Sequence, residues 1–460
     1  MDRKDQIIAE LMAEVERLRG ELQALRQEVA RLKKNSQNSS KPPSSDIVKP
    51  APSPPAAGRR RKRRAIGGQP GHAKHQRRPF GPEEVDQIVE LELPANQTRG
   101  LQPLRRWRIV QQVELVEKPF VITEYRARCY RDRRTGQIVR APLPPAVVAA
   151  GLVGPRLSAA LAFQKAACHM SYSAIHTFWQ DLTGLSICRG QLVKVVQKAS
   201  RAIRQPYEEL REALRHEDRL GIDESGHQNA GKRHWTWCFR AQRFTVFHIA
   251  PSRGSDVLRA VLGETFGGVI GCDYFSAYQK YMADSGAIVQ FCMAHLIRDV
   301  RFLAEQSDAC LARWGEKLLG WLRKLFHTLH RRDRMSAPGF ARRMEAIRQG
   351  FLKQVRHPPS RAEARTLAAR FRGREADHYF TFLTTPGIEP TNNRTEQAIR
   401  HVVIDRRVTQ GTRGDAGMRW CERAWTVLAT CAQQGRRAFK FLHDALLAHF
   451  TAQPAPSLLA

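Results

Sequence analysis

The sequence predicts an α/β protein in which a C-terminal catalytic region is preceded by accessory segments. Three observations support this prediction. A heptad repeat fills the first 34 residues, a stretch rich in Ser, Pro and Arg follows it, and short apolar runs that end in aspartates alternate with helical patterns after residue 218. The length of 460 residues allows two to four domains at about 100–200 residues each.

Residues 1–34 are predicted to form a coiled-coil dimerisation helix. Their apolar residues recur at alternating spacings of three and four. The a positions are Ile8, Val15, Leu22 and Val29, and the d positions are Leu11, Leu18, Leu25 and Leu32. β-Branched residues at most a positions with Leu at every d position favour a parallel two-stranded coil, and hence a homodimer or a higher even-numbered oligomer. The alternative is a helix that packs against the core of its own chain.

Residues 35–82 are predicted to be a disordered, basic linker. They are rich in Ser, Pro, Gly, Lys and Arg, and they bury too few apolar groups to offset the entropy of an ordered chain. One uninterrupted basic run consists of Arg59, Arg60, Arg61, Lys62, Arg63 and Arg64. We expect this run to contact the phosphate backbone of DNA, although such runs also occur as solvated tails.

Two further segments precede the catalytic region. Residues 83–150 carry alternating β-branched and aromatic residues, as in IVQQVELV and FVITEYRARCY, which predicts a small β-rich DNA-binding module. Residues 151–217 are helical in pattern, and a turn at Gly184 separates two helices as in a helix-turn-helix. The second helix would offer four side chains to the major groove, namely Arg189, Gln191, Lys194 and Lys198. The alternative is a helical hairpin that binds nothing.

The net charge is +32, from 76 Lys and Arg against 44 Asp and Glu. Such an excess predicts a polyanionic partner, and we favour nucleic acid over an anionic membrane because no lipidation motif is visible. We find no run of about 18 apolar residues and no signal peptide, which predicts a cytoplasmic protein without a membrane segment. The nine cysteines are scattered, as expected for reduced thiols.

Three acidic residues carry the catalytic prediction. Asp223 and Asp273 each end a short apolar run that is typical of a core strand, so they can face each other across a sheet. Glu396 lies on the first turn of a helix that an asparagine at 392 or 393 caps. Three carboxylates on separate elements suit Mg²⁺ or Mn²⁺, and two such ions can drive phosphoryl transfer. The alternatives are that the aspartates are ordinary turn residues and that Glu396 pairs with Arg400 on an exposed face.

Several short motifs follow one another in a specific order. They are NSSKPPSSD and GGQPGH in the linker, DES at Asp223, CDYFSAY at Asp273, CMAHLIRD around His295 and TNNRTEQAIRHVVIDRR around Glu396. Over nearly its full length the chain therefore resembles the insertion-sequence-66 family of bacterial DDE transposases. The resemblance implies an RNase H-like catalytic core over residues 218–460, with metal-dependent DNA cleavage and strand transfer by a triad of Asp223, Asp273 and Glu396. Glu224 is the alternative first ligand, but adjacent strand residues point to opposite faces.

The stretch between Asp273 and Glu396 is longer than a minimal RNase H-like core needs. It carries Leu, Trp and Phe at helical spacing, as in WGEKLLGWLRKLFHTLH. This pattern predicts a helical insertion at about residues 300–385.

Zinc is not expected. Many members of the family carry a cysteine zinc module after GGQPGH, but between residues 80 and 145 this chain has only Cys129. Cys292 and His295 are three residues apart, and no second pair completes a site. We expect His295 to face the catalytic pocket and contact DNA, and a plain core histidine is the alternative. Three residues near or after the third acid are expected to contact phosphates, namely Arg400, Arg406 and Arg407.

We therefore expect a bacterial DNA transposase that binds the terminal repeats of its element and the target DNA, with two Mg²⁺ or Mn²⁺ ions as cofactor. Helper proteins of the same element are conceivable partners. It would act in the cytoplasm, associated with the nucleoid when bound to DNA. Three other functions are open: a catalytically silent repressor or end-binding protein, an RNase H-like nuclease or resolvase that cuts without joining, and a basic structural RNA-binding protein. The last leaves the three acids unexplained.

Overall fold

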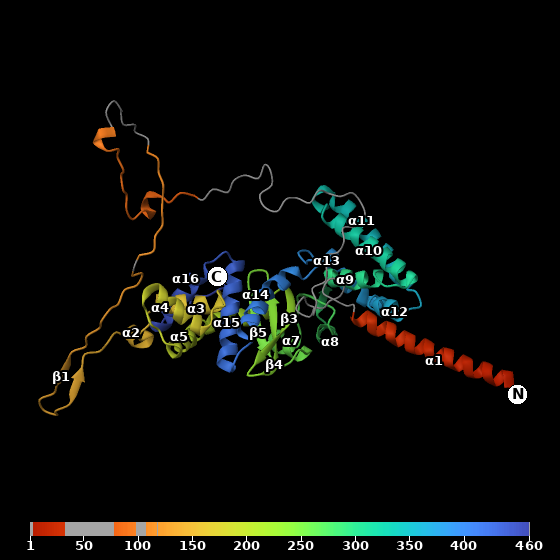
Figure 1. The fold of residues 1–460 in the computed structure, drawn as a ribbon, viewed down its shortest axis with the longest axis horizontal. Coiled ribbons are helices and arrows are strands. Elements are labelled where there is room, and N and C mark those ends of the chain that lie inside the picture. The colour runs from red at the N-terminus through yellow and green to blue at the C-terminus, as the bar shows by residue number, and fades with distance from the viewer. Residues whose placement is uncertain (1–2, 33–77, 98–106, 117, 460) are drawn as a thin grey trace. The chain divides into compact units, whose positions relative to one another are not determined.

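The computed structural model describes residues 3–32, 78–97, 107–116 and 118–459 (Figure 1). The chain forms two compact units, one of residues 1–50 with 126–460 and one of residues 51–125. The basic run at 59–64 lies outside the described residues, as does most of the linker predicted at 35–82. The elements that carry the predicted triad all belong to the larger unit.

The larger unit is built around a five-stranded mixed sheet. Its strands are β3 (Arg219–Asn229), β4 (Lys232–Arg240), β5 (Thr245–Ala250), β6 (Val269–Cys272) and β7 (Ile288–Phe291). Their order is β5-β4-β3-β6-β7, with β3, β4 and β5 antiparallel and with β6 and β7 parallel to β3. β6 pairs with β3 only from Arg219 to Gly221, so the rest of β3 has β4 on one edge and no strand of this sheet on the other.

Helices cover both faces of the sheet. On one face, Cys238 of β4 packs with Val402 of α14 (Asn393–Thr409) and Trp425 of α15 (Asp415–Gln433). On the other face, Trp237 of β4 contacts Tyr278 of α8 (Ser276–Ser285), with ring centroids 6.1 Å apart, and α7 (Ser255–Leu262) packs in the same core. Successive strand residues thus point to opposite faces, and the sheet is buried between two helical layers.

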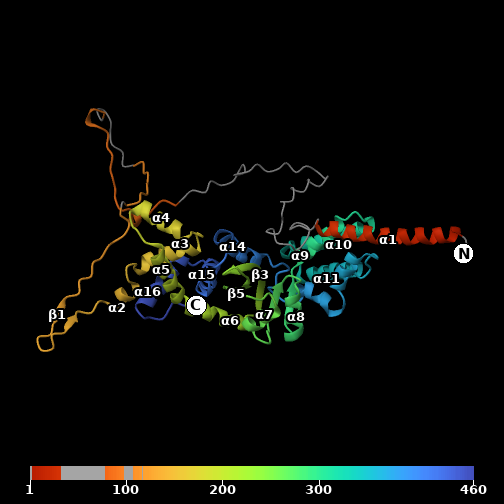
Figure 2. The ribbon, with the colours of Figure 1, turned by 60° about the horizontal axis from the view of Figure 1, so that its bottom comes forward.

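The start of α14 is fixed directly on β3. The Asn392 side chain donates a hydrogen bond to the carbonyl oxygen of Ile222 over 2.7 Å. Beside it, a Cβ on Gly221 would meet the Thr395 hydroxyl and the Asn392 amide oxygen, so the helix approaches as closely as glycine allows. Figure 1 and Figure 2 both show α14 beside β3. This contact places Glu396, on the first turn of α14, next to the middle of β3.

The chain between β7 and α14 is helical. It contains α9 (Met293–Ala304), α10 (Ala309–Leu329), α11 (Ala337–Val355), α12 (Ala362–Ala369) and α13 (Thr381–Thr384), with 3₁₀ turns at Arg332–Arg334 and Gly373–Tyr379. Its end returns to the sheet, because Thr381 Oγ1 donates to the carbonyl oxygen of Val289 at 2.7 Å. The Gln290 side chain also donates to the carbonyl oxygen of Tyr379 at 3.1 Å. These bonds bring the chain back to β7 before α14 begins.

A helical region precedes the sheet and receives the last helix of the chain. Its elements are α2 (Pro145–Ala150), α3 (Pro155–Ala166), α4 (Tyr172–Thr183), α5 (Arg189–Ala202), α6 (Arg204–Ala213) and α16 (Ala438–Phe450). α4 ends at Gly184, whose φ of 70° is left-handed and is readily adopted by glycine. α4 and α5 share a small core with α3, formed by Leu161, Ile175, Ile187, Leu192 and Val195. The arrangement is helix, turn, helix.

Two histidines join this helical region to α14. His169 Nδ1 lies 3.0 Å from Oδ1 of the buried Asp405, and His401 Nε2 lies 3.1 Å from the carbonyl oxygen of Ala166. The two imidazole rings are 4.4 Å apart. α14 therefore contacts the sheet through its first turn and the helical region through its later turns.

The β-rich module expected at residues 83–150 is not found in the described part of this segment. Its strands are β1 (Cys129–Arg131) and β2 (Ile138–Arg140), which form a short antiparallel hairpin. The alternating residues before them, at 107–116 and 118–125, form no strand, and Val121 is 91% exposed. Alternation needs a partner strand and a core face to become a sheet, and these residues have neither.

One segment is a weak exception to the expectation that the chain has no membrane-length apolar segment. Among the described residues, Pro145–Ala166 is long enough to cross a membrane, and an 18-residue stretch within it, at a mean hydropathy of 1.7, is apolar enough. In the structure this segment is two helices, α2 and α3, with a left-handed Gly151 between them. Ala159 and Ala162 are fully buried in the protein core. One such segment is weak evidence for a membrane span, because core helices of other proteins pass the same test.

The N-terminal segment forms one helix, α1 (Arg3–Leu32). Seven residues of the predicted seam are exposed, namely Ile8, Leu11, Val15, Leu18, Leu22, Leu25 and Val29. Pairing of two such helices remains a prediction.

Gly221→Ala is expected to lower the free energy of unfolding by about 1–3 kcal/mol. The reason is that the new Cβ would push the first turn of α14 away from β3. Gly271 is the matched control, because it is paired with Gly221 in the sheet and a Cβ there would lie 3.7 Å from the nearest atom, an ordinary contact. Urea denaturation compares the two variants, and equal losses would contradict close packing of α14 on β3.

Candidate active site

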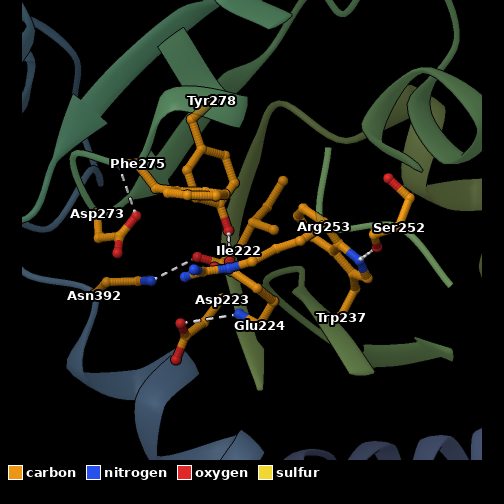
Figure 3. A network of polar contacts seen from close by, with 10 residues as sticks. All are labelled: Ile222, Asp223, Glu224, Trp237, Ser252, Arg253, Asp273, Phe275, Tyr278 and Asn392. Carbon is orange, nitrogen blue, oxygen red and sulfur yellow. Dashed lines mark hydrogen bonds and ion pairs between the residues drawn. The ribbon is translucent and has the colours of Figure 1, made fainter. Parts of the chain in front are cut away.

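Asp223 and Asp273 lie where two parallel strands diverge. Gly221 of β3 pairs with Gly271 of β6, and each aspartate is two residues further along its own strand direction. Asp273 directly follows β6, as expected from the sequence. Asp223, however, lies in the middle of β3 rather than at its end, because β3 continues to Asn229 by antiparallel pairing with β4. In the view of Figure 3, the side chain of Asn392 lies between the two carboxylates.

Each of these carboxylates accepts one hydrogen bond from the nearby backbone. Asp223 Oδ1 accepts from the Glu224 amide at 2.9 Å, and Asp273 Oδ1 accepts from the Phe275 amide at 3.1 Å. Figure 3 shows both bonds. These bonds orient the side chains and leave most of their oxygen lone pairs without a donor among the described residues, so the oxygens can serve as ligands.

Crowding makes both aspartates hard to ionise. Burial raises the pKa of Asp223 well above its ordinary value, and the carboxylates of Glu224, Asp273 and Glu396 raise it further. Burial also raises the pKa of Asp273 to about 6, and Glu224 adds to that shift, whereas His295 and Arg253 oppose it. The fold thus concentrates negative charge here, and a bound cation would relieve it.

Glu396 is held in a different way. Its Oε1 lies 3.1 Å from Nε2 of His295, on the first turn of α9, and 3.7 Å from Nη2 of Arg298. The hydrogen bond from His295 is the main reason that the pKa of Glu396 is lowered, so this carboxylate is ionised. The predicted DNA contact His295 therefore bonds to a member of the predicted triad.

Glu224, the alternative first ligand, points into a separate network. Its carboxylate lies 2.6 Å from Nη2 of Arg253 and accepts a 2.5 Å hydrogen bond from the Tyr278 hydroxyl (Figure 3). Arg253 in turn stacks on the rings of Phe275 and Trp235. Both oxygens of Glu224 have protein partners, and the side chain is only 2% exposed. This network could not be predicted from the sequence, because its members are distant along the chain.

The three carboxylates are not the tightest group of potential metal ligands. Among the described residues, the one group of three whose ligand atoms lie within 4.8 Å of each other is Cys292, His295 and Glu396. Cys292 and His295 alone are half a site, and the fold adds Glu396 to them. However, Cys292 Sγ accepts the Asn392 amide at 3.2 Å, and burial raises the pKa of its thiol. The hydrogen bond holds the sulfur in place, and burial outweighs it in raising the pKa, which disfavours the thiolate that zinc requires.

The predicted groove-reading helix α5 presents part of its expected set. Arg189 and Lys194 are exposed, and Gln191 is half-buried. Lys198 differs from them, because its Nζ donates to the carbonyl oxygens of Ala149 and Ala150 at 2.7 and 2.9 Å. Lys198 thus satisfies the C-terminal carbonyls of α2.

The arginines of α14 also divide into two groups. Arg400 and Arg407 are exposed, as a phosphate contact requires. Arg406 is half-buried, and its Nη1 donates to Ser225 Oγ at 3.0 Å and to the carbonyl oxygen of Gly226. Arg406 therefore binds the free edge of β3.

Comparison with known proteins agrees with this geometry. A family model described as "Transposase IS66 family" matches residues 150–420, which is more than half of the chain and includes all three acids. A second model, described as a family of unknown function (DUF6444), matches residues 2–78. No curated protein matches the chain.

Asp273→Asn is expected to stabilise the metal-free protein at neutral pH. The pKa of Asp273 is about 6 in the fold, above its ordinary value of 3.8, so its contribution to stability is full below about pH 4 and is lost as the pH rises through 6. The variant should therefore match the wild type at pH 4 and exceed it by about 1–3 kcal/mol at pH 7. Urea denaturation between pH 4 and 8 in EDTA measures this difference.

Asp333→Asn, at an exposed position in a 3₁₀ turn, is the control. A difference between Asp273→Asn and wild type that stays constant over this pH range would contradict the raised pKa.

Proposed function

Because the chain belongs to the IS66 family of transposases, we propose that it cleaves DNA at the ends of an insertion sequence and joins those ends to target DNA in a metal-dependent reaction. The observation that carries this proposal is the pair of half-buried aspartates, Asp223 and Asp273, where β3 and β6 diverge, with Glu396 brought near them by α14. Among the described residues, no hydrogen-bonded cation satisfies the pair as Arg253 and Tyr278 satisfy Glu224.

An RNase H-like core is part of this proposal. The strand order β5-β4-β3-β6-β7, with three antiparallel strands followed by two parallel ones, supports it. Helices α9–α13 would then be an insertion between the last strand and the helix that carries the third acid. The protein would act in the cytoplasm, on nucleoid DNA.

Divalent ions fit the three carboxylates by charge and by ligand type. Mg²⁺ and Mn²⁺ prefer carboxylate oxygens, and neither aspartate forms an ion pair within the described part of the chain. Asp223 is the central member, because Asp273 and Glu396 both raise its pKa. With two ions about 3.5–4 Å apart, Asp273 and Glu396 can serve different ions and need not lie close to each other.

The protein's own groups would then have distinct tasks. Bound ions would activate the attacking water or 3′-hydroxyl and stabilise the leaving oxygen. Asp223 and Asp273 would hold them, and so would Glu396 through Oε2, which has no partner among the described residues. His295 would keep Oε1 of Glu396 in place and so fix the orientation of this carboxylate.

Basic side chains outside the triad would hold the DNA. The basic run at 59–64 would contact the backbone, and Arg189, Gln191 and Lys194 of α5 would face a groove. Arg400 and Arg407 would meet phosphates near the triad.

Strand transfer with oligonucleotides that carry the flanking element ends tests the triad. Asp223→Asn, Asp273→Asn and Glu396→Gln are each expected to lower the yield of joined product by more than about 100-fold in Mg²⁺ or Mn²⁺, since loss of an outer-shell partner alone costs about 10–100-fold. DNA affinity should be unchanged, and the exposed Asp333→Asn should behave as wild type.

The outcomes separate the candidate functions. Wild-type binding without cutting or joining, also with helper proteins of the element present, would identify a silent end-binding protein. Cutting without joining would identify a nuclease or resolvase. Full activity of any triad variant would remove that residue from the metal site.

Pairing of α1 helices has its own test. Glutamate at two d positions, Leu11→Glu with Leu18→Glu, is expected to convert a dimer into a monomer in sedimentation velocity, because it places charges in the seam. Ala9→Glu with Ala13→Glu is the matched control, since these exposed positions lie outside the seam. If both double variants keep the mass of the wild type, α1 does not dimerise the protein.

A further inference from the structure

A second charged feature lies further along β3, past the carboxylates. It is a pocket of about 490 Å³ between the β3–β4 hairpin and the C-terminal half of α14. Residues that line it include Arg233, Arg406, Arg407, His227, Gln228 and Gln410. No aspartate or glutamate is among the lining residues.

The pocket exists because one edge of β3 has no strand beside it. After Gly221 that edge is contacted by α14 and by the loop that follows it, instead of by β6. Arg406 bonds to Gly226 at this edge, and Thr412 closes its end by exchanging two 2.8 Å backbone hydrogen bonds with Gln228 and Ala230. The walls are thus held by backbone contacts, which makes the pocket a fixed part of the fold.

The positive charge of the pocket is uncompensated. None of the three guanidinium groups forms an ion pair with an acid in the described parts of the chain. Arg233 is held over the ring of Trp235 at 4.7 Å, and Arg406 is fixed through Nη1, which leaves its other donors without a described partner. Burial and the charge of Arg407 both lower the pKa of Arg406. His227 adds no charge at neutral pH, because burial lowers its pKa to about 4.

Three convergent arginines without counter-ions suit a phosphate, because a guanidinium offers paired donors to its oxygens. The pocket and the carboxylates also share one strand. Residues 226–228 follow Asp223 by three to five positions, which is about 10–17 Å along a strand. At about 3.4 Å per nucleotide of duplex axis, this corresponds to three to five nucleotides.

We propose that this pocket binds the phosphodiester backbone of the bound DNA, about three to five nucleotides from the position that is cut. This proposal rests on the proposed function, since it takes DNA as the substrate that reaches Asp223. The pocket would fix the strand beside the carboxylates and so set where along the DNA the reaction occurs.

The test measures how DNA affinity depends on salt. Full-length wild type and the double variant Arg233→Ala with Arg407→Ala are titrated with a 30-base-pair duplex of the element end between 0.05 and 0.3 M KCl, in EDTA so that no cutting occurs. Arg406 stays unchanged because it also supports β3. Arg342→Ala with Arg343→Ala is the matched control, since both arginines are exposed on α11 and the net charge changes equally.

The pocket variant is expected to reduce the slope of log K against log [salt] by about 0.9 if the arginines share one phosphate and by about 1.8 if they hold two. With equal affinities of the two proteins at 1 M salt as the reference, these changes in slope correspond to losses of about 5-fold and 30-fold in the DNA affinity of the pocket variant at 0.15 M. The control should keep the wild-type slope.

A second measurement locates the contact. Methylphosphonate linkages, which lack the charge, are placed one at a time along the strand and counted from the terminal nucleotide of the element. Linkages placed three to five nucleotides from the terminus should weaken DNA binding by the wild type and should not weaken binding by the pocket variant any further.

Three outcomes would overturn the proposal. One is strong wild-type binding with the same slope in the pocket variant. Another is that inorganic phosphate raises the melting temperature of the wild type but not of the pocket variant, while both bind DNA with the same salt dependence. The occupant of the pocket would then be a free anion. The third is a wild type that does not bind DNA, which would remove the proposed function too. Loss of joining in the assay above, with these salt effects intact, would overturn only the proposed chemistry.

Discussion

Repulsion between crowded carboxylates is the constraint on which this structure depends. Asp223 and Asp273 lie on either side of Asn392 where β3 and β6 diverge, and burial raises the pKa of both, with nearby carboxylates raising it further. An arrangement of this kind does not persist unless other contacts over-determine it. Here they are the paired strands, the network of Glu224, Arg253 and Tyr278 behind the strand, and the bond from Asn392 to Ile222 in front of it. The proposed function and the stability of the fold therefore oppose each other at the same side chains.

The position of Glu396 depends on the long helical segment between β7 and α14. His295 and Glu396 are in contact, yet α10 to α13 lie between them in the sequence. This segment returns to the sheet because Thr381 and Tyr379 form hydrogen bonds with β7 just before α14 begins. Changes in the helical segment can therefore alter the site without touching any acid, by shifting where α14 starts on β3.

Local patterns predicted those features that local chemistry determines. Gly184 ends α4 in the left-handed conformation that its position after a helical run suggested, and the helical spacing around residues 309–329 is matched by α10. Features that depend on distant pairing were not predictable. The continuation of β3 beyond Asp223 needs β4, and the alternating residues at 107–116 and 118–125 have no partner strand among the described residues. The carbonyl groups that Lys198 and Arg406 bind are distant in the sequence, so both residues were expected to be available for DNA.

The histidine contacts of α14 have a further consequence. Glu396 lies on its first turn, and Asp405, nine residues later, bonds to His169 of the helical region. At 1.5 Å per residue, this fixes about 13–14 Å between the two contacts. A single rigid helix, α14, thus sets a constant distance between the acids and the helices that would read DNA. The distance along the DNA between the cut and the bases that are read would then be set by the length of this helix. Moving the cut by a single base pair would require bending the DNA or breaking the contact between Asp405 and His169.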